Sequence, residues 1–118
     1  MKRYNRRILH ANDAMLPISF EFYPPKTDEQ RAQLDRSVHK LKAHAPQFMS
    51  VTFGAGGSTL SHTPETVQRL RSEHGVAGVP HLTCVGGNRE EIRSLLKLYR
   101  ALGCDRIVAL RGDTPSGM

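Results

Sequence analysis

The sequence contains no tryptophan, only two cysteines and no long apolar run. A membrane-spanning helix needs roughly 20 consecutive apolar residues, so we expect none here. Cys84 and Cys104 have no paired spacing, which favours free thiols in a reducing, cytoplasmic compartment over a secreted, disulfide-built fold. The first residues, MKRYNRRILHAND, lack the apolar centre of a secretory signal, so we expect no leader peptide there.

Acidic side chains are the scarcer charged class, with 11 Asp and Glu against 17 Lys and Arg and a formal net charge of +6. Most of the excess comes from the first seven residues, which hold Lys2, Arg3, Arg6 and Arg7. A basic patch interleaved with aromatic residues, typical of nucleic-acid-binding modules, is absent. We therefore interpret residues 1–14 as a solvated basic arm and residues 15–118 as one domain, and we keep a nucleic-acid-binding module as an alternative.

Short apolar runs alternate with amphipathic runs along the domain. The pattern predicts strands over residues 15–22, 47–53, 78–85 and 105–112, and helices within residues 28–43, 62–75 and 88–103. Thr27 and Asn88 are the expected N-caps, and Gln30 follows Thr27 at the capping-box spacing.

This alternation predicts an α/β fold with parallel strands and helical crossovers. It fits a doubly wound sheet or a TIM-type (β/α)8 barrel of which about four β/α units are present. A barrel needs about 250 residues and eight strands, and four parallel strands leave an open edge. We expect residues 15–118 to be the N-terminal half of a barrel in a longer enzyme, and the 118-residue chain to be inactive alone.

Functional residues of β/α folds gather at the carboxyl ends of the strands. All four expected strands end in polar or glycine-rich sequence. The candidate site residues, in strand order, are Glu21 on the first strand, Thr52 and Phe53 before GAGGS on the second, His81, Thr83 and Cys84 on the third, and Arg111, Gly112 and Asp113 on the fourth. Together these ends indicate a ligand site more strongly than any single motif.

Glu21 lies between Phe20 and Phe22 in the stretch SFEFYPPKT. A lone strand glutamate is more often a structural carboxylate paired with an arginine. Burial between the two phenylalanines would instead keep the carboxyl protonated near neutrality and suit it to act as a general acid.

The other strand ends also leave alternatives open. GAGGST is either a plain turn or a place where backbone approaches a flat or anionic ligand, and it is not a Walker loop. His81 taken alone is more often a core histidine. Arg111 suits a phosphate or carbonyl, and Asp113 suits a ring N–H. The remaining histidines have no ligand spacing, so we expect no metal site; they are His10, His39, His44, His62 and His74.

Four motifs, FEFYPPKT, VTFGAGGST, PHLTC and IVALRGDTP, closely resemble the methylenetetrahydrofolate reductase family in their order and spacing. The resemblance runs from about Pro17 to Pro115. It implies a (β/α)8 barrel that binds FAD at the carboxyl ends of its strands. It also implies reduction of 5,10-methylenetetrahydrofolate to 5-methyltetrahydrofolate with NADH or NADPH, in one-carbon and methionine metabolism, by an enzyme that is often a homo-oligomer.

The resemblance also implies roles for single residues. Glu21 matches the proton donor, and Thr52 matches a nicotinamide contact. Asp113 matches a group that meets both the flavin and the folate. The positions that match flavin contacts are Phe53, Ala55, His81, Arg111, Gly112 and Asp113. Phe53 departs from the tyrosine or tryptophan that is common in the family.

The implied chemistry gives Glu21 a task, because methylene-folate reacts only after its five-membered ring opens, and opening needs a proton on the leaving nitrogen. A pterin-binding methyltransferase on a similar barrel, using Glu21 as an acid, is the alternative enzyme.

Overall fold

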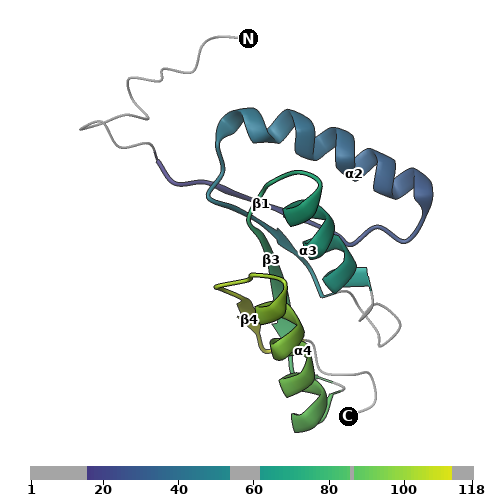
Figure 1. Ribbon diagram of the computed structural model, residues 1–118, viewed down its shortest axis with the longest axis vertical. Helices are drawn as coiled ribbons and strands as arrows, with labels where there is room; N and C mark the ends of the chain where they lie inside the picture. The colour runs from purple at the N-terminus through teal and green to yellow at the C-terminus, as the bar shows by residue number, and fades with distance from the viewer. Residues whose placement is uncertain (1–15, 54–61, 86, 113–118) are drawn as a thin grey trace.

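The computed structural model describes residues 16–53, 62–85 and 87–112 (Figure 1). Within these ranges strands and helices alternate in the order β1 (Ser19–Phe22), α2 (Asp28–Leu41), β2 (Phe48–Val51), α3 (His62–Ser72), β3 (Gly78–Thr83), α4 (Arg89–Ala101) and β4 (Val108–Leu110), with a short 3-10 helix η2 (Lys42–His44) after α2. The expected elements are therefore present, although each strand is shorter than its sequence pattern suggested. The arm expected over residues 1–14 lies outside the described residues.

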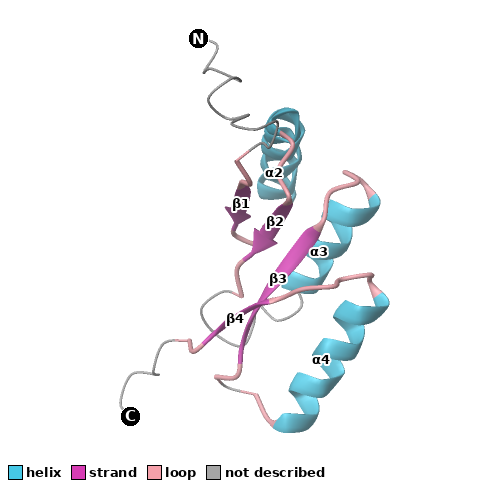
Figure 2. Cartoon of the chain, turned by 90° about the vertical axis from the view of Figure 1, so that its left-hand side faces the viewer, coloured by secondary structure: helices cyan, strands magenta, loops and turns pink. Residues whose placement is uncertain are grey.

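The sheet is parallel throughout, with the strands in the order β1-β2-β3-β4. The helices pack on one face of it, because side chains of α2, α3 and α4 enter a single apolar cluster with residues of β2 (Figure 2). A doubly wound sheet reverses its strand order and has helices on both faces. Sequential order with helices on one face is the arrangement of a (β/α)8 barrel, so the structure decides between the two folds that the alternation allowed.

The apolar cluster contains Met49 and Val51 of β2, and Phe20 and Phe22 of β1 pack against it. Its buried centre also takes residues from each helix, namely Leu34, Val38, Val67, Leu70 and Tyr99. Successive strand residues point to opposite faces, so the even residues of β1 and the odd residues of β2 form the helix-facing side. Their neighbours in sequence form the opposite face of the sheet.

Local signals explain where the helices begin. Asn88 and Glu91 form a complete capping box at α4, with Glu91 N donating to Asn88 Oδ1 at 2.8 Å and Asn88 N donating to Glu91 Oε2 at 3.1 Å. At α2, Gln30 N donates to Thr27 Oγ1 at 3.1 Å as predicted. The Gln30 side chain, however, accepts from Lys26 N at 2.8 Å. In a complete capping box it would accept from Thr27 N, so the backbone donor is displaced by one residue.

Pro80 lies inside β3, which pairs with strands on both sides. Met49 N donates to Ala77 O at 3.0 Å, so the backbone groups of odd-numbered residues in β3 face β2 and those of Pro80 face β4. Pairing with β4 begins only at His81 and Val108. The N–H that proline lacks therefore falls at the end of the ladder, where its loss costs little.

Among the described residues, no helix has the length and apolar character needed to cross a bilayer. Cys84 and Cys104 are both free thiols, as expected.

Candidate functional site

The face of the sheet turned away from the helices carries polar side chains from three strands. Glu21 of β1 pairs in register with Ser50 of β2, and Ser50 pairs with Val79 of β3. His81 and Thr83 follow Val79 at spacings of two, so they share its face. In a closed barrel this face lines the interior, and we refer to Glu21, Ser50, Val79, His81 and Thr83 as the inner face.

Glu21 and His81 meet on the inner face. Glu21 Oε1 lies 3.1 Å from His81 Nε2, and the exposed fractions of the two side chains are 62% and 8%. The two atoms make an ion-pair contact, but no hydrogen bond of good geometry joins them, and Nε2 has no other hydrogen-bond partner in the described structure. The partner of Glu21 is thus a histidine two strands away rather than an arginine.

The expectation that Phe20 and Phe22 bury Glu21 is wrong. Both phenylalanines pack into the helix-facing cluster, whereas Glu21 points to the other face and is exposed. The reason is the strand period of two, which sends adjacent side chains in opposite directions. Flanking apolar residues in a strand therefore do not bury the residue between them.

The end of β2 is fixed to the start of α3. Thr52 N donates to Phe22 O at 2.9 Å, and Thr63 Oγ1 donates to Thr52 O at 2.9 Å. The side-chain Oγ1 of Thr52 is buried without a hydrogen-bond partner among the described residues. Phe53 is half-buried, and Ala55 lies outside the described residues. Sequence reasoning missed Thr63, whose place before Pro64 in the first turn of a helix was the available signal.

The end of β4 lies against the end of β3. Thr83 Oγ1 donates to Arg111 O at 3.2 Å and accepts from Val85 N at 3.2 Å. Gly112 has φ +79°, and a Cβ there would overlap Thr83 Oγ1 and stand 2.9 Å from Val85 Cγ2. Glycine at 112 is thus required by the backbone and by this close approach. Arg111 is exposed, and Asp113 lies outside the described residues.

The structure thus brings Glu21, Thr52, His81 and the Arg111 backbone to one end of the sheet, as the strand-end rule predicted. Two of the expected contacts, Ala55 and Asp113, fall on residues that it does not describe.

A second polar cluster lies on the helix side. Ligand atoms of Asp35, Glu73 and His74 lie within 4.8 Å of one another, a spacing that could hold a metal ion. The Arg69 guanidinium already binds Asp35, with Nε 3.0 Å from Oδ1 and Nη2 2.6 Å from Oδ2. This hydrogen-bonded arginine holds the pKa of Asp35 at about 2. We interpret the cluster as an ion-pair network that joins α2 to α3.

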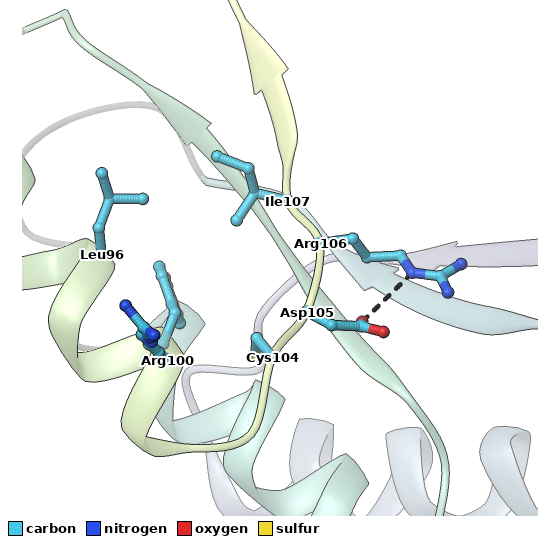
Figure 3. A pocket seen from close by; sticks show the side chains of 7 residues that line it. Leu96, Arg100, Cys104, Asp105, Arg106 and Ile107 are labelled. Carbon is cyan, nitrogen blue, oxygen red and sulfur yellow. Dashed lines mark hydrogen bonds and ion pairs between the residues drawn. The ribbon is translucent and has the colours of Figure 1, made fainter.

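A hollow of about 370 Å³ lies between α4 and the segment that leads into β4. Leu96, Tyr99 and Arg100 line one side and residues 104–107 the other, with an ion pair between Arg106 and Asp105 at 3.4 Å (Figure 3). It adjoins the amino end of β4, so it is not the site formed at the carboxyl ends of the strands.

Comparison with known proteins gives consistent results. The family model described as methylenetetrahydrofolate reductase matches residues 6–118. The chain is 39% identical over 100 residues to the 5,10-methylenetetrahydrofolate reductase of Salmonella typhimurium, covering 85% of this chain and 34% of the relative. The corresponding protein of Buchnera aphidicola is 39% identical over 111 residues, which is 94% of this chain and 38% of that relative.

A plant relative extends the match over nearly the whole chain. The "Methylenetetrahydrofolate reductase (NADH) 1" of Zea mays is 37% identical over 117 residues, covering 99% of this chain and 20% of the relative. The chain therefore spans about a third of the length of the bacterial relatives it matches, and less of the plant one.

Proposed function

The chain belongs to the methylenetetrahydrofolate reductase family, and on that premise we propose that it forms the N-terminal half of the barrel of an enzyme that reduces 5,10-methylenetetrahydrofolate to 5-methyltetrahydrofolate. The proposed enzyme uses FAD and NADH or NADPH, works in cytoplasmic one-carbon and methionine metabolism, and assembles as a homo-oligomer. NADH is the reductant in the name of the Zea mays relative.

The observation that carries the proposal is the grouping of Glu21, Thr52 and His81 at the carboxyl end of the sheet. Two polar atoms there, Thr52 Oγ1 and His81 Nε2, are buried without a hydrogen-bond partner in the described structure. Unpaired buried polar atoms are uncommon in proteins, and a ligand that offers donors and acceptors is one way to satisfy them.

The described residues of the site are chemically suited to contact a flavin. Thr52 and His81 offer unpaired buried polar atoms, which the donors and acceptors of a flavin can satisfy. When bound, FAD supplies hydride transfer from NAD(P)H to the folate. We propose the residues that match the family, Phe53, Ala55, Arg111, Gly112 and Asp113, as further flavin contacts, with Asp113 also meeting the folate.

Glu21 is the proposed proton donor. Its exposed carboxyl on the inner face can reach a ligand bound there. Protonation of the leaving nitrogen of methylene-folate opens the five-membered ring and leaves an iminium carbon, which is the hydride acceptor. General acids of this kind contribute roughly 10²–10⁴-fold to a rate.

The proposal is tested by Glu21→Gln in the complete enzyme. We expect flavin reduction by NADH to stay within about threefold of wild type and flavin reoxidation by methylene-folate to fall at least about 100-fold, since only the second step needs the proton. Stopped-flow absorbance of the flavin measures both rates. The matched control is Glu29→Gln, an exposed carboxylate in the first turn of α2 that lies away from the inner face.

Equal losses in both half-reactions would contradict the role of Glu21. A complete protein that binds no flavin would refute the reductase proposal and point to another pterin-binding enzyme.

A further inference from the structure

The contact between Glu21 and His81 crosses the sheet from β1 to β3, although β2 lies between them. The residue of β2 in register with Glu21 is Ser50, which is buried. A short side chain at this position leaves space above β2 for the carboxylate and the imidazole to meet. A larger residue at position 50 would fill that space.

The two partners have opposite environments. The His81 side chain is 8% exposed, and its Nε2 has no hydrogen-bond partner in the described structure, whereas Glu21 is 62% exposed. The proposed proton donor thus faces solvent, while the imidazole beside it is shielded from solvent.

No other charged side chain of the described residues is in ion-pair contact with this pair. Ser50 and Thr52 of the neighbouring segment and Thr83 on the same strand as His81 are neutral groups. Arg111 follows β4 and is exposed. Among the described residues, Glu21 and His81 therefore form the ion-pair contact of the inner face.

We infer that His81 is a positioning residue that holds the Glu21 carboxyl and stores the proton that Glu21 passes on. This inference rests on the proposed reductase function of the same site. The His81 Nε2–H bond breaks as a Glu21 Oε1–H bond forms, and that O–H bond then breaks as an N–H bond forms on the leaving nitrogen of the folate. Solvent returns a proton to the neutral imidazole, so no oxidant or reductant takes part.

The first test is His81→Gln in the complete enzyme. The glutamine amide keeps a donor near the position of Nε2 but transfers no proton at these pH values. We expect single-turnover reoxidation by methylene-folate to fall about tenfold at pH 7 and to fall less at pH 5, where solvent supplies protons more readily. His39→Gln, an exposed histidine on α2, is the control and should change neither rate.

A double-mutant cycle separates this role from a direct flavin contact. If His81 acts through Glu21, adding His81→Gln to Glu21→Gln should change the residual rate less than about twofold. A tenfold loss in both backgrounds, or an equal loss at pH 5 and pH 7, would overturn the inference. Unchanged flavin absorbance and unchanged thermal unfolding verify that the variants fold.

A readout independent of turnover is the imidazole spectrum of histidine-labelled enzyme. We expect the His81 resonance, identified by its loss in His81→Gln, to shift in Glu21→Gln and to keep its position in His39→Gln, because Nε2 lies 3.1 Å from Glu21 Oε1. If this resonance shifts in Glu21→Gln but methylene-folate does not reoxidise the flavin, the pairing stands and the proposed function fails. If the enzyme is active and the resonance keeps its position in Glu21→Gln, the inference fails.

Discussion

At the scale of single residues, Gly112 is a position where the structure permits little change. Its φ of +79° lies in the left-handed region, and the space where a Cβ would stand is taken by Thr83 and Val85. The Thr83 hydroxyl cannot turn away freely, because it bonds both Arg111 O and Val85 N. Gly75 offers a comparison, since its φ is +63° but no atom lies within 4 Å of the place that a Cβ would take.

We predict that Gly112→Ala lowers the free energy of unfolding by about 2–4 kcal/mol, and Gly75→Ala by only about 1–2 kcal/mol. Both pay the left-handed backbone strain of about 1–2 kcal/mol, and only Gly112→Ala adds a steric clash. Urea unfolding followed by circular dichroism gives both values. Adding Thr83→Ala should restore part of the loss in Gly112→Ala but none in Gly75→Ala, and equal costs at the two glycines would refute this explanation.

Residue identity was easier to predict from the sequence than residue environment. Glu21, Thr52 and His81 were found from their positions at strand ends. The pairing of Glu21 with His81 was not, because it depends on the stagger between β1 and β3 and on the small side chain of Ser50 between them. Those quantities come from the assembled sheet and leave no local pattern.

At the scale of elements, the contact between α2 and α3 depends on Asp35. Its carboxylate binds Arg69 through two hydrogen bonds and lies 2.8 Å from His74 Nε2. The arginine holds the Asp35 pKa at about 2, below the ordinary value of 3.8. A carboxyl whose folded-state pKa is depressed stabilises the fold above its unfolded pKa and loses that contribution as the pH falls through the folded value.

We therefore predict that Asp35→Asn lowers the free energy of unfolding by about 1–2 kcal/mol at pH 7, after allowance for the partial exposure of the pair. The difference from wild type should shrink between about pH 4 and pH 2 and vanish below that range. Urea titrations at a series of pH values measure it.

Asp105→Asn is the control for this pair. Asp105 lies 3.4 Å from Arg106 with a 73% exposed side chain, so its loss should cost less than about 0.5 kcal/mol at every pH. A pH-independent effect at Asp35 would show that the ion pair is not its cause.

Helix starts were predictable because caps are local. Thr27 and Asn88 satisfy N–H groups only three residues away. Strand ends were overestimated, since β propensity continues past the last paired residue and pairing ends where the neighbouring strand does. The shortest strand, β4, has three residues and pairs only with β3 within the described structure.

At the scale of the whole molecule, exposed apolar side chains gather around α4 and β4. Leu96 and Leu98 of α4 and Ile107 and Leu110 near β4 are 38–43% exposed. In Figure 2 these two elements lie at the end of the sheet away from α2. An apolar surface beside an unpaired strand edge favours association.

We predict that the 118-residue chain by itself self-associates at micromolar concentration, and that Leu98→Lys combined with Ile107→Lys shifts it at least about tenfold towards monomer. Sedimentation velocity measures the distribution. Lys97→Gln, on the same helix, leaves the apolar residues in place and should have no effect. A wild-type chain that stays monomeric throughout the range would contradict the prediction.

The alternation of side chains along β1 has a consequence for how this protein can be altered. Phe20 and Phe22 pack into the cluster under the helices, whereas Glu21 belongs to the inner face. Neighbouring residues of β1 therefore have different roles, because the phenylalanines stabilise the fold and Glu21 serves the chemistry of the site. A library that varies only the inner-face positions of the strands can search for new substrates while the parts of the sequence that build the scaffold stay untouched.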